Sequence, residues 1–293
     1  MRVSAPRCTL TASLTYTLGK DLYIPLTSRC NTRTLPETRG PNFALPPHVV
    51  SSLCTVRDLE TQTQQWKYWC LWLDTQDDTT RHKLPQRNAM TQAARLPTVQ
   101  QLLDDVEQQV GSSGAAGFQS FVIAGEGEPT LRMGELLELT QSLRATYTDV
   151  PIRLTTNGLL SRQSGSINIG SDIGDDNNDG DNNDGDSGDN DEEDMNATVP
   201  QQLHDAGVSQ VSVALMTSDA DQYNELMEPN CQRGAEDPLP HSRVCDFISQ
   251  CLVHGIEVET TGVDRPDVKK PPAEELAKSL SVVKPFRWRP FFP

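Results

Sequence analysis

The pattern of apolar positions along the chain predicts short buried strands that alternate with amphipathic helices. Apolar residues recur at helical spacing over residues 99–110, 133–143, 199–206, 223–227, 244–252 and 273–280. Six apolar runs have the length and flanking turn residues of strands: residues 22–26, 121–124, 152–155, 211–215, 256–261 and 286–289. This alternation predicts parallel strands joined by helical crossovers, and therefore an α/β fold. An open doubly wound sheet and a partial TIM barrel of the (βα)6 type both fit, and we favour the barrel.

Local signals support several of the helix boundaries. Pro97 and Thr98 precede the first helical stripe and are typical of a helix start. Gly207 follows the third stripe, and Gly255 follows the fifth, where a C-terminal cap is expected. These signals place turns where the strands and helices are expected to alternate.

Two long segments interrupt this alternation within a single predicted domain, residues 1–293. Residues 40–96 exceed the length of a crossover and hold Trp66, Trp69 and Trp72, which we interpret as the core of an insert. Residues 161–198 form a low-complexity Asp/Asn/Gly tract with nothing to bury, which predicts a long acidic disordered loop. Part of that tract, residues 175–180, matches the opening of an EF-hand calcium loop, but the flanks lack paired helices.

The charge of the chain is concentrated in the acidic tract. The chain has 41 acidic and 25 basic residues and a mean hydropathy of −0.52. Twelve of the acids lie within residues 172–194, so the remainder carries 29 acids against 25 bases. A nucleic-acid-binding protein is expected to present a basic face, and the composition therefore argues against nucleic-acid partners.

The cysteines and the apolar runs indicate a reducing compartment and no membrane span. The seven cysteines are scattered without a CxxC pair, so reduced thiols and a cytoplasmic location are expected. An organelle location is the alternative, because the first 20 residues carry Arg, Ser and Thr but no acid. The sequence contains no run of about 20 apolar residues, so no transmembrane helix is predicted.

The candidate chemistry begins where the second predicted strand ends. Gly125 and Gly127 let backbone N–H groups approach a ligand closely, while Glu126 and Glu128 place carboxylates beside it, ahead of Pro129. A phosphate site would avoid that negative charge. The turn therefore favours a cationic group of a small-molecule ligand, such as an amine.

Two further groups of residues lie at predicted strand ends, and each has two interpretations. Thr156 and Asn157 follow the third strand, where they either contact a ligand or only form the strand-exit turn. Lys284, Arg287 and Arg289 surround the last strand, where they either bind a carboxylate or phosphate or pair with nearby acids. The sequence does not separate these interpretations.

In order and spacing, several of these segments resemble the radical S-adenosylmethionine superfamily, and most closely its TatD-associated branch. The resemblance rests on GEGEPTLR at 125–132, LTTNG at 154–158, VSVAL at 211–215 and YNELMEP at 223–229. Residues 71–73, 258–263 and 286–290 add to it. It extends from about residue 14 to the C-terminus, apart from the two inserts.

The resemblance implies a fold, two cofactors and a partner. The fold is a partial TIM barrel that holds a [4Fe–4S] cluster through a CxxxCxxC loop after the first strand. The open iron binds S-adenosylmethionine, which is cleaved to a radical. By the same resemblance the turn at Gly127, Glu128 and Pro129 grips the amino group of the cofactor, Gly125, Thr156 and Asn157 contribute to its site, and a TatD-type protein is a partner.

The chain departs from this family at the cluster loop. Cys30 matches the first cysteine, but Thr34 and Glu37 occupy the second and third positions. Iron–sulfur clusters are held by thiolates, which threonine and glutamate do not supply. Cys30 is therefore either a metal ligand or a structural thiol, and no catalytic residue is assigned.

Two hypotheses about function follow from this departure. In one, the protein is a pseudoenzyme that keeps an S-adenosylmethionine-type pocket. In the other, it is an active enzyme whose [4Fe–4S] cluster is completed unconventionally by Cys8, Cys54 or Cys70.

Overall fold

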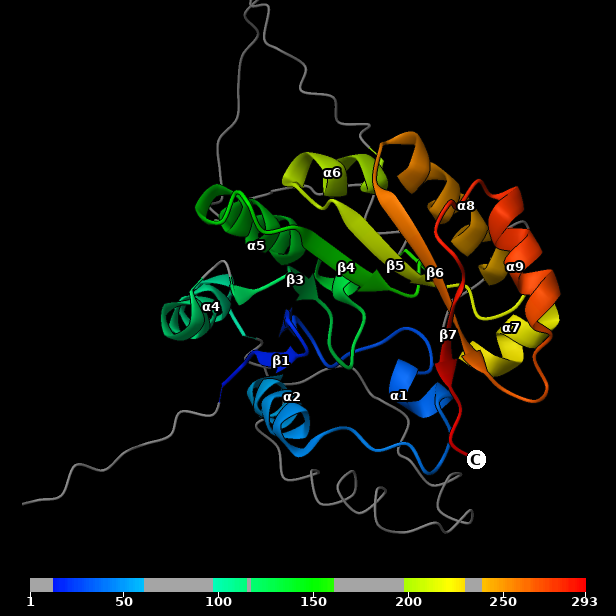
Figure 1. Ribbon diagram of the computed structural model, residues 1–293, viewed down its shortest axis with the longest axis horizontal. Coiled ribbons are helices and arrows are strands. Elements are labelled where there is room, and N and C mark those ends of the chain that lie inside the picture. Colours follow the sequence, from blue (N-terminus) through cyan, green and yellow to red (C-terminus); the bar gives the residue numbers. More distant parts are fainter. Residues whose placement is uncertain (1–12, 61–96, 115–116, 161–197, 230–238) are drawn as a thin grey trace, which may run out of the picture.

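The chain folds into an α/β structure around one curled, seven-stranded sheet that has the form of a half-barrel (Figure 1). The computed structural model describes residues 13–60, 97–114, 117–160, 198–229 and 239–293. The strands lie in chain order across the sheet: β1 (Tyr16–Leu18), β2 (Asp21–Ile24), β3 (Ser120–Ile123), β4 (Ile152–Thr156), β5 (Gln210–Ala214), β6 (Glu257–Asp264) and β7 (Arg287–Pro290). This is the predicted partial TIM-barrel architecture.

The parallel pairing runs from β2 to β7, as the strand–helix alternation predicts. β1 was not predicted as a separate strand, and it pairs with β2 in an antiparallel hairpin. The turn between them contains Gly19, whose φ of 64° is readily adopted by glycine. The hairpin adds a seventh strand to the six that the apolar runs indicate.

The helices in chain order are α1 (Leu35–Thr38), α2 (Pro47–Glu60), α4 (Val99–Ser113), α5 (Met133–Thr146), α6 (Val199–Ala206), α7 (Ala220–Met227), α8 (Pro240–Val253) and α9 (Lys270–Ser279), with a 3₁₀ turn, η4 (Pro129–Arg132). Those from α4 to α9 match the predicted stripes and cover the convex face of the sheet (Figure 1). The predicted start and stop signals are confirmed at Thr98, which caps α4, and at Gly207, which ends α6 in a left-handed conformation. α1 and α2 lie on the opposite, open side of the sheet (Figure 1).

The two predicted inserts are described only in part. The first insert contributes helix α2, but its tryptophans lie outside the described residues, as does almost all of the acidic tract. No helix in the described ranges is long and apolar enough to cross a membrane.

The two faces of the sheet differ in chemistry because side chains alternate along each strand. The convex face is apolar and fully buried, with Leu22, Ile24, Ile152, Leu154 and Val211 among its residues. The concave face carries an apolar cluster of Tyr16, Val49 and Leu53 at its β1 end, and elsewhere polar side chains that contact one another across the sheet. On that face Arg153 pairs with Asp21, and Ser212 donates a hydrogen bond to Glu259 at 3.0 Å. The sheet thus separates a buried apolar core from a concave face on which most of the polar contacts lie.

Candidate functional site

The turn after β3 is organised around the Glu128 carboxylate. Glu128 is the N-cap of η4, and its Oε1 accepts hydrogen bonds from the backbone N–H of Thr130 at 3.1 Å and from the Thr130 hydroxyl at 2.8 Å. Proline at the next position, Pro129, suits a helix start because it has no N–H to leave unbonded. The short 3₁₀ turn then leads directly into α5.

The same carboxylate also joins the end of β3 to the end of β4. Oε1 accepts a third hydrogen bond from the Thr156 hydroxyl at 2.8 Å, and Oε2 accepts one from the backbone N–H of Asn157 at 2.7 Å. Glu128 is only 2% exposed. Burial raises its pKa, and the hydrogen bonds from Asn157, Thr156 and Thr130 oppose that shift. A carboxylate offers about four acceptor positions, two on each oxygen, so Oε2 keeps one toward a further donor.

The two glycines of the turn are needed because their own chain approaches them. A Cβ on Gly127 would lie 2.3 Å from the carbonyl oxygen of Arg29 and 2.6 Å from that of Thr27. A Cβ on Gly125 would lie 2.6 Å from the Pro25 Cβ. Backbone hydrogen bonds fix the same contact, from Gly127 N to Thr27 O and from Glu128 N to Arg29 O. The close backbone approach that the sequence assigned to a ligand is made by the segment after β2.

Residues 29–33 cross the end of the sheet and bond to the far side. The Asn31 amide donates to Leu159 O at 2.8 Å, and the Asn157 amide donates to Asn31 Oδ1 at 2.6 Å. The backbone N–H of Arg33 donates to Met227 O at 2.6 Å, and its guanidinium pairs with Glu228. The segment is therefore held to the ends of both β4 and α7.

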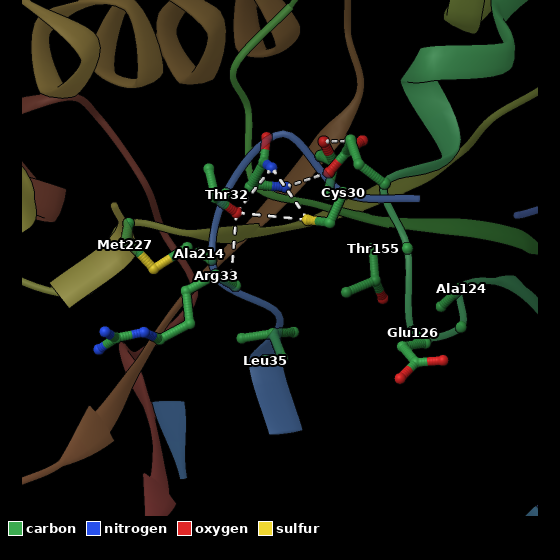
Figure 2. Close-up of a pocket in the computed structure, with 14 residues that line it drawn as sticks. Cys30, Thr32, Arg33, Leu35, Ala124, Glu126, Thr155, Ala214 and Met227 are labelled. Carbon is green, nitrogen blue, oxygen red and sulfur yellow. Dashed lines mark hydrogen bonds between the residues drawn. The ribbon is translucent and has the colours of Figure 1, made fainter. Parts of the chain in front are cut away.

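Cys30 lies inside this crossing segment, beside Thr32 (Figure 2). Its Sγ is 3.4 Å from the Thr32 hydroxyl and 3.9 Å from the Asn157 amide nitrogen. Burial raises the pKa of the thiol, with smaller opposing effects from the Thr32 hydrogen bonds. A raised pKa disfavours the thiolate, which is the form that binds metal.

Thr34 and Glu37, which stand at the second and third positions of the cluster loop, bond to each other. The Glu37 carboxylate accepts hydrogen bonds from the backbone N–H of Thr34 at 2.7 Å and from its hydroxyl at 2.9 Å. This is the reciprocal part of a capping box, and it starts α1. The two positions thus serve a helix terminus.

In the described part of the chain, no three His, Cys, Asp or Glu side chains are placed to hold a metal ion. Cys8 and Cys70, two of the thiols considered for an unconventional cluster, lie outside the described residues. The described residues around Cys30 therefore do not fit a [4Fe–4S] cluster, which needs several thiolates.

A small cavity lies at this end of the sheet, and six of the seven predicted site residues line it. They are Cys30, Gly125, Gly127, Glu128, Thr156 and Asn157; the seventh, Pro129, is buried in η4. The cavity measures about 30 Å³, which is room for a water molecule or two, whereas small-molecule sites typically measure about 300–1,000 Å³. That any of these residues binds a ligand stays a prediction.

The cavity also contains residues that the sequence analysis did not select, among them Thr32, Arg33, Ala214 and Met227 (Figure 2). Ala214 ends β5, so the rule that parallel strands end at one edge would have found it. Met227 ends α7 and carries no such signal. Glu126 is 8% exposed and lines the cavity. Burial raises the pKa of Tyr16, and Tyr23 and then Glu126 add to that shift.

Comparisons with known proteins assign no family to the chain. No family model and no curated protein matches the sequence. Among solved structures, SuiB of Streptococcus suis is similar at 14% identity and a TM-score of 0.41 over 64% of this chain and 33% of SuiB. HydG, a maturase of the [FeFe]-hydrogenase, is similar at 9% identity and a TM-score of 0.39 over 86% of this chain and 49% of HydG. An enolase from Pseudomonas fluorescens gives a TM-score of 0.23. The chain thus spans half or less of the length of SuiB and of HydG.

Proposed function

We propose that this protein is a non-catalytic relative of the radical S-adenosylmethionine barrels. In this proposal it holds no [4Fe–4S] cluster and keeps a small-molecule site at the carboxyl ends of β3 and β4. The sequence motifs at 125–132 and 154–158 support the relationship. A TatD-type partner and a cytoplasmic location remain predictions from the sequence.

The observation that carries the proposal is the bonding between Thr34 and Glu37. A cluster needs soft thiolate ligands at these positions, and the side chains present instead satisfy each other as a helix cap. Only Cys30 supplies a thiol there, and one thiolate is too few to hold a cluster. Without a cluster the protein has no internal electron source with which to cleave a sulfonium.

The ligand chemistry that best suits the cavity is a cationic amine of S-adenosylmethionine type. Oε2 of the buried Glu128 keeps acceptor capacity, and charge-assisted hydrogen bonds to a carboxylate are among the stronger ones. Glu126 adds a second carboxylate to the lining. Because the cavity is only about 30 Å³, a whole nucleoside enters only if residues 29–33 move away.

Anaerobic reconstitution with iron and sulfide tests the proposal. The wild-type chain is compared with Cys30→Ala and with the double variant Thr34→Cys/Glu37→Cys, which restores the CxxxCxxC spacing. We expect iron near zero for the wild type and for Cys30→Ala. The restored chain should gain up to about four irons per chain, together with a visible charge-transfer band.

The opposite pattern would refute the proposal. About four irons in the wild type, lost on Cys30→Ala, would mean that a cluster forms with other ligands and that radical chemistry is available. Equilibrium dialysis with labelled S-adenosylmethionine tests the binding site separately, because a cluster-free chain that binds the nucleoside differs from one that binds nothing. Glu126→Gln should weaken that binding.

A further inference from the structure

Three arginines from distant parts of the sequence meet beside β7. Arg287 and Arg289 belong to this strand, and Arg39 ends α1. The segment after α1 runs alongside the chain after β7 (Figure 1). The backbone N–H of Phe292 donates to Arg39 O at 2.8 Å, and Arg39 Nε donates to Pro290 O at 2.8 Å. The contact is therefore fixed by one backbone hydrogen bond and one from the Arg39 side chain.

Among the described residues, the acids near this cluster do not balance its charge. Lys284 pairs with Glu257 at 3.0 Å, and Arg287 pairs with Glu259 at 3.3 Å. No ion pair between described residues includes Arg289. Three guanidiniums and the Glu259 carboxylate leave a formal charge of +2 in one place.

Arg289 is the residue that lacks an explanation within the fold. Its Nε is buried and has no hydrogen-bond partner. Burial, followed by Arg287 and then Arg39, lowers its pKa to about 10, whereas Glu259 and Tyr23 act in the opposite direction. Burying a polar donor without a partner costs free energy, and gathering like charges adds to that cost.

Ring stacking accounts for only one member of the cluster. The Arg39 guanidinium lies 4.3 Å from the Phe43 ring centroid and 5.3 Å from that of Phe292, which are cation–π distances. Arg289 has no such contact in the described chain. Among the described residues the cluster therefore keeps an unpartnered donor at Arg289 Nε and one ion pair, between Arg287 and Glu259.

We propose that Arg39, Arg287 and Arg289 form a binding site for the phosphate group of a small molecule, at the open edge of the half-barrel. Guanidinium groups present forked donors that match phosphate oxygens in pairs. A phosphate monoester carries close to two negative charges at neutral pH, which matches the local excess, whereas a carboxylate neutralises half of it. The site does not depend on the proposed function, because it involves none of the cavity residues.

Calorimetric titration of the full chain with inorganic phosphate at constant ionic strength tests the site. Arg289→Gln removes the charge, and Arg289→Lys keeps the charge but lacks the forked donors of a guanidinium. The control is Arg144→Gln, because the exposed Arg144 guanidinium donates to Thr148 O. We expect saturable binding to the wild type and to Arg144→Gln. Binding should be at least tenfold weaker in Arg289→Gln and intermediate in Arg289→Lys. Circular dichroism checks that each variant folds, and Arg39→Gln replaces Arg289→Gln if that variant does not.

Two outcomes would overturn the proposal. Non-saturable heats, or equal affinities in the wild type and Arg289→Gln, would mean that the arginines do not form a site. Acetate binding as tightly as phosphate under the same conditions would overturn the assignment to a phosphate group. Neither outcome bears on iron binding at Cys30, so the two proposals fail separately.

Discussion

Replacing Gly127 by alanine separates two reasons for a glycine in the turn after β3. If the glycine serves a ligand, the substitution changes ligand binding and leaves the free energy of unfolding alone. If it serves the packing of the chain, the substitution destabilises the fold. The structure favours the second reason, because the added Cβ would lie 2.3 Å from Arg29 O, 2.6 Å from Thr27 O and 2.7 Å from Arg29 N.

The size of the effect follows from what must move. All three contacts are backbone atoms, so relief requires the segment after β2 to separate from the turn. That movement strains two hydrogen bonds, from Gly127 N to Thr27 O at 3.2 Å and from Glu128 N to Arg29 O at 2.7 Å. Overpacking costs about 1–3 kcal/mol and each hydrogen bond about 1 kcal/mol, so the free energy of unfolding should fall by about 4 kcal/mol.

Gly134→Ala is the matched control. Gly134 lies in the first turn of α5, is exposed, and has nothing within 4 Å of the position of an added Cβ. Its replacement should stabilise the protein by about 0.5 kcal/mol through helix propensity and the unfolded state. Urea unfolding followed by circular dichroism measures both variants. A Gly127→Ala variant as stable as Gly134→Ala would refute the packing explanation.

Three other substitutions test the site and its surroundings. Glu128→Gln places an amide NH₂ against a backbone N–H and should cost about 2 kcal/mol near pH 5. Because burial raises the pKa of Glu128 above 4.5, the wild type loses stability as the pH rises through that pKa, whereas the variant has no carboxyl group there to titrate. Urea unfolding at pH 5 and at pH 8 should therefore show that the difference in free energy of unfolding between the two proteins narrows at the higher pH. A difference that widens contradicts this. The raised pKa of Cys30 predicts that iodoacetamide alkylates this thiol more slowly at pH 8 than it alkylates a free cysteine. Thr32→Val removes a hydrogen bond that lowers this pKa, so it should slow the alkylation further. Peptide mapping in which Cys30 reacts as fast as a free cysteine, or faster in the variant than in the wild type, contradicts this. Arg132→Lys should lower the free energy of unfolding by about 2 kcal/mol, because the buried guanidinium bonds to Leu26 O, Pro97 O and Glu135. The control is Arg144→Lys, at an exposed arginine. Urea unfolding that shows no larger a loss for Arg132→Lys than for this control contradicts the explanation.

The elements of this fold were predictable because their causes are local. An apolar run identifies β3, and a Thr–x–x–Gln capping box at Thr98 and Gln101 fixes the start of α4 within four residues. Gly207 ends α6 because it is nearly unrestricted at a φ of 106°. The β1–β2 hairpin was missed because β1 has only three residues, too few to show a period of two.

The site was predictable in place, since parallel strands end at one edge of a sheet, but the roles of its residues were not. Gly127 is required by Thr27 and Arg29, about 100 positions earlier in the chain. Glu128 bonds to Thr156 and Asn157 on the next strand. Such contacts have no signature in the spacing of residues along the sequence.

The cationic residues near the C-terminus likewise have predictable positions along the chain but unpredictable partners. Residue identity alone predicts that Lys284, Arg287 and Arg289 lie at or near the last strand, and that Thr34 and Glu37 cannot act as thiolates. The folded chain shows that Lys284 pairs with Glu257 and Arg287 with Glu259, and that no ion pair between described residues includes Arg289. Composition and local pattern fix what each side chain can do, because these properties belong to single residues and their near neighbours. Charge pairing, burial and close approach depend on which distant segments the fold brings together.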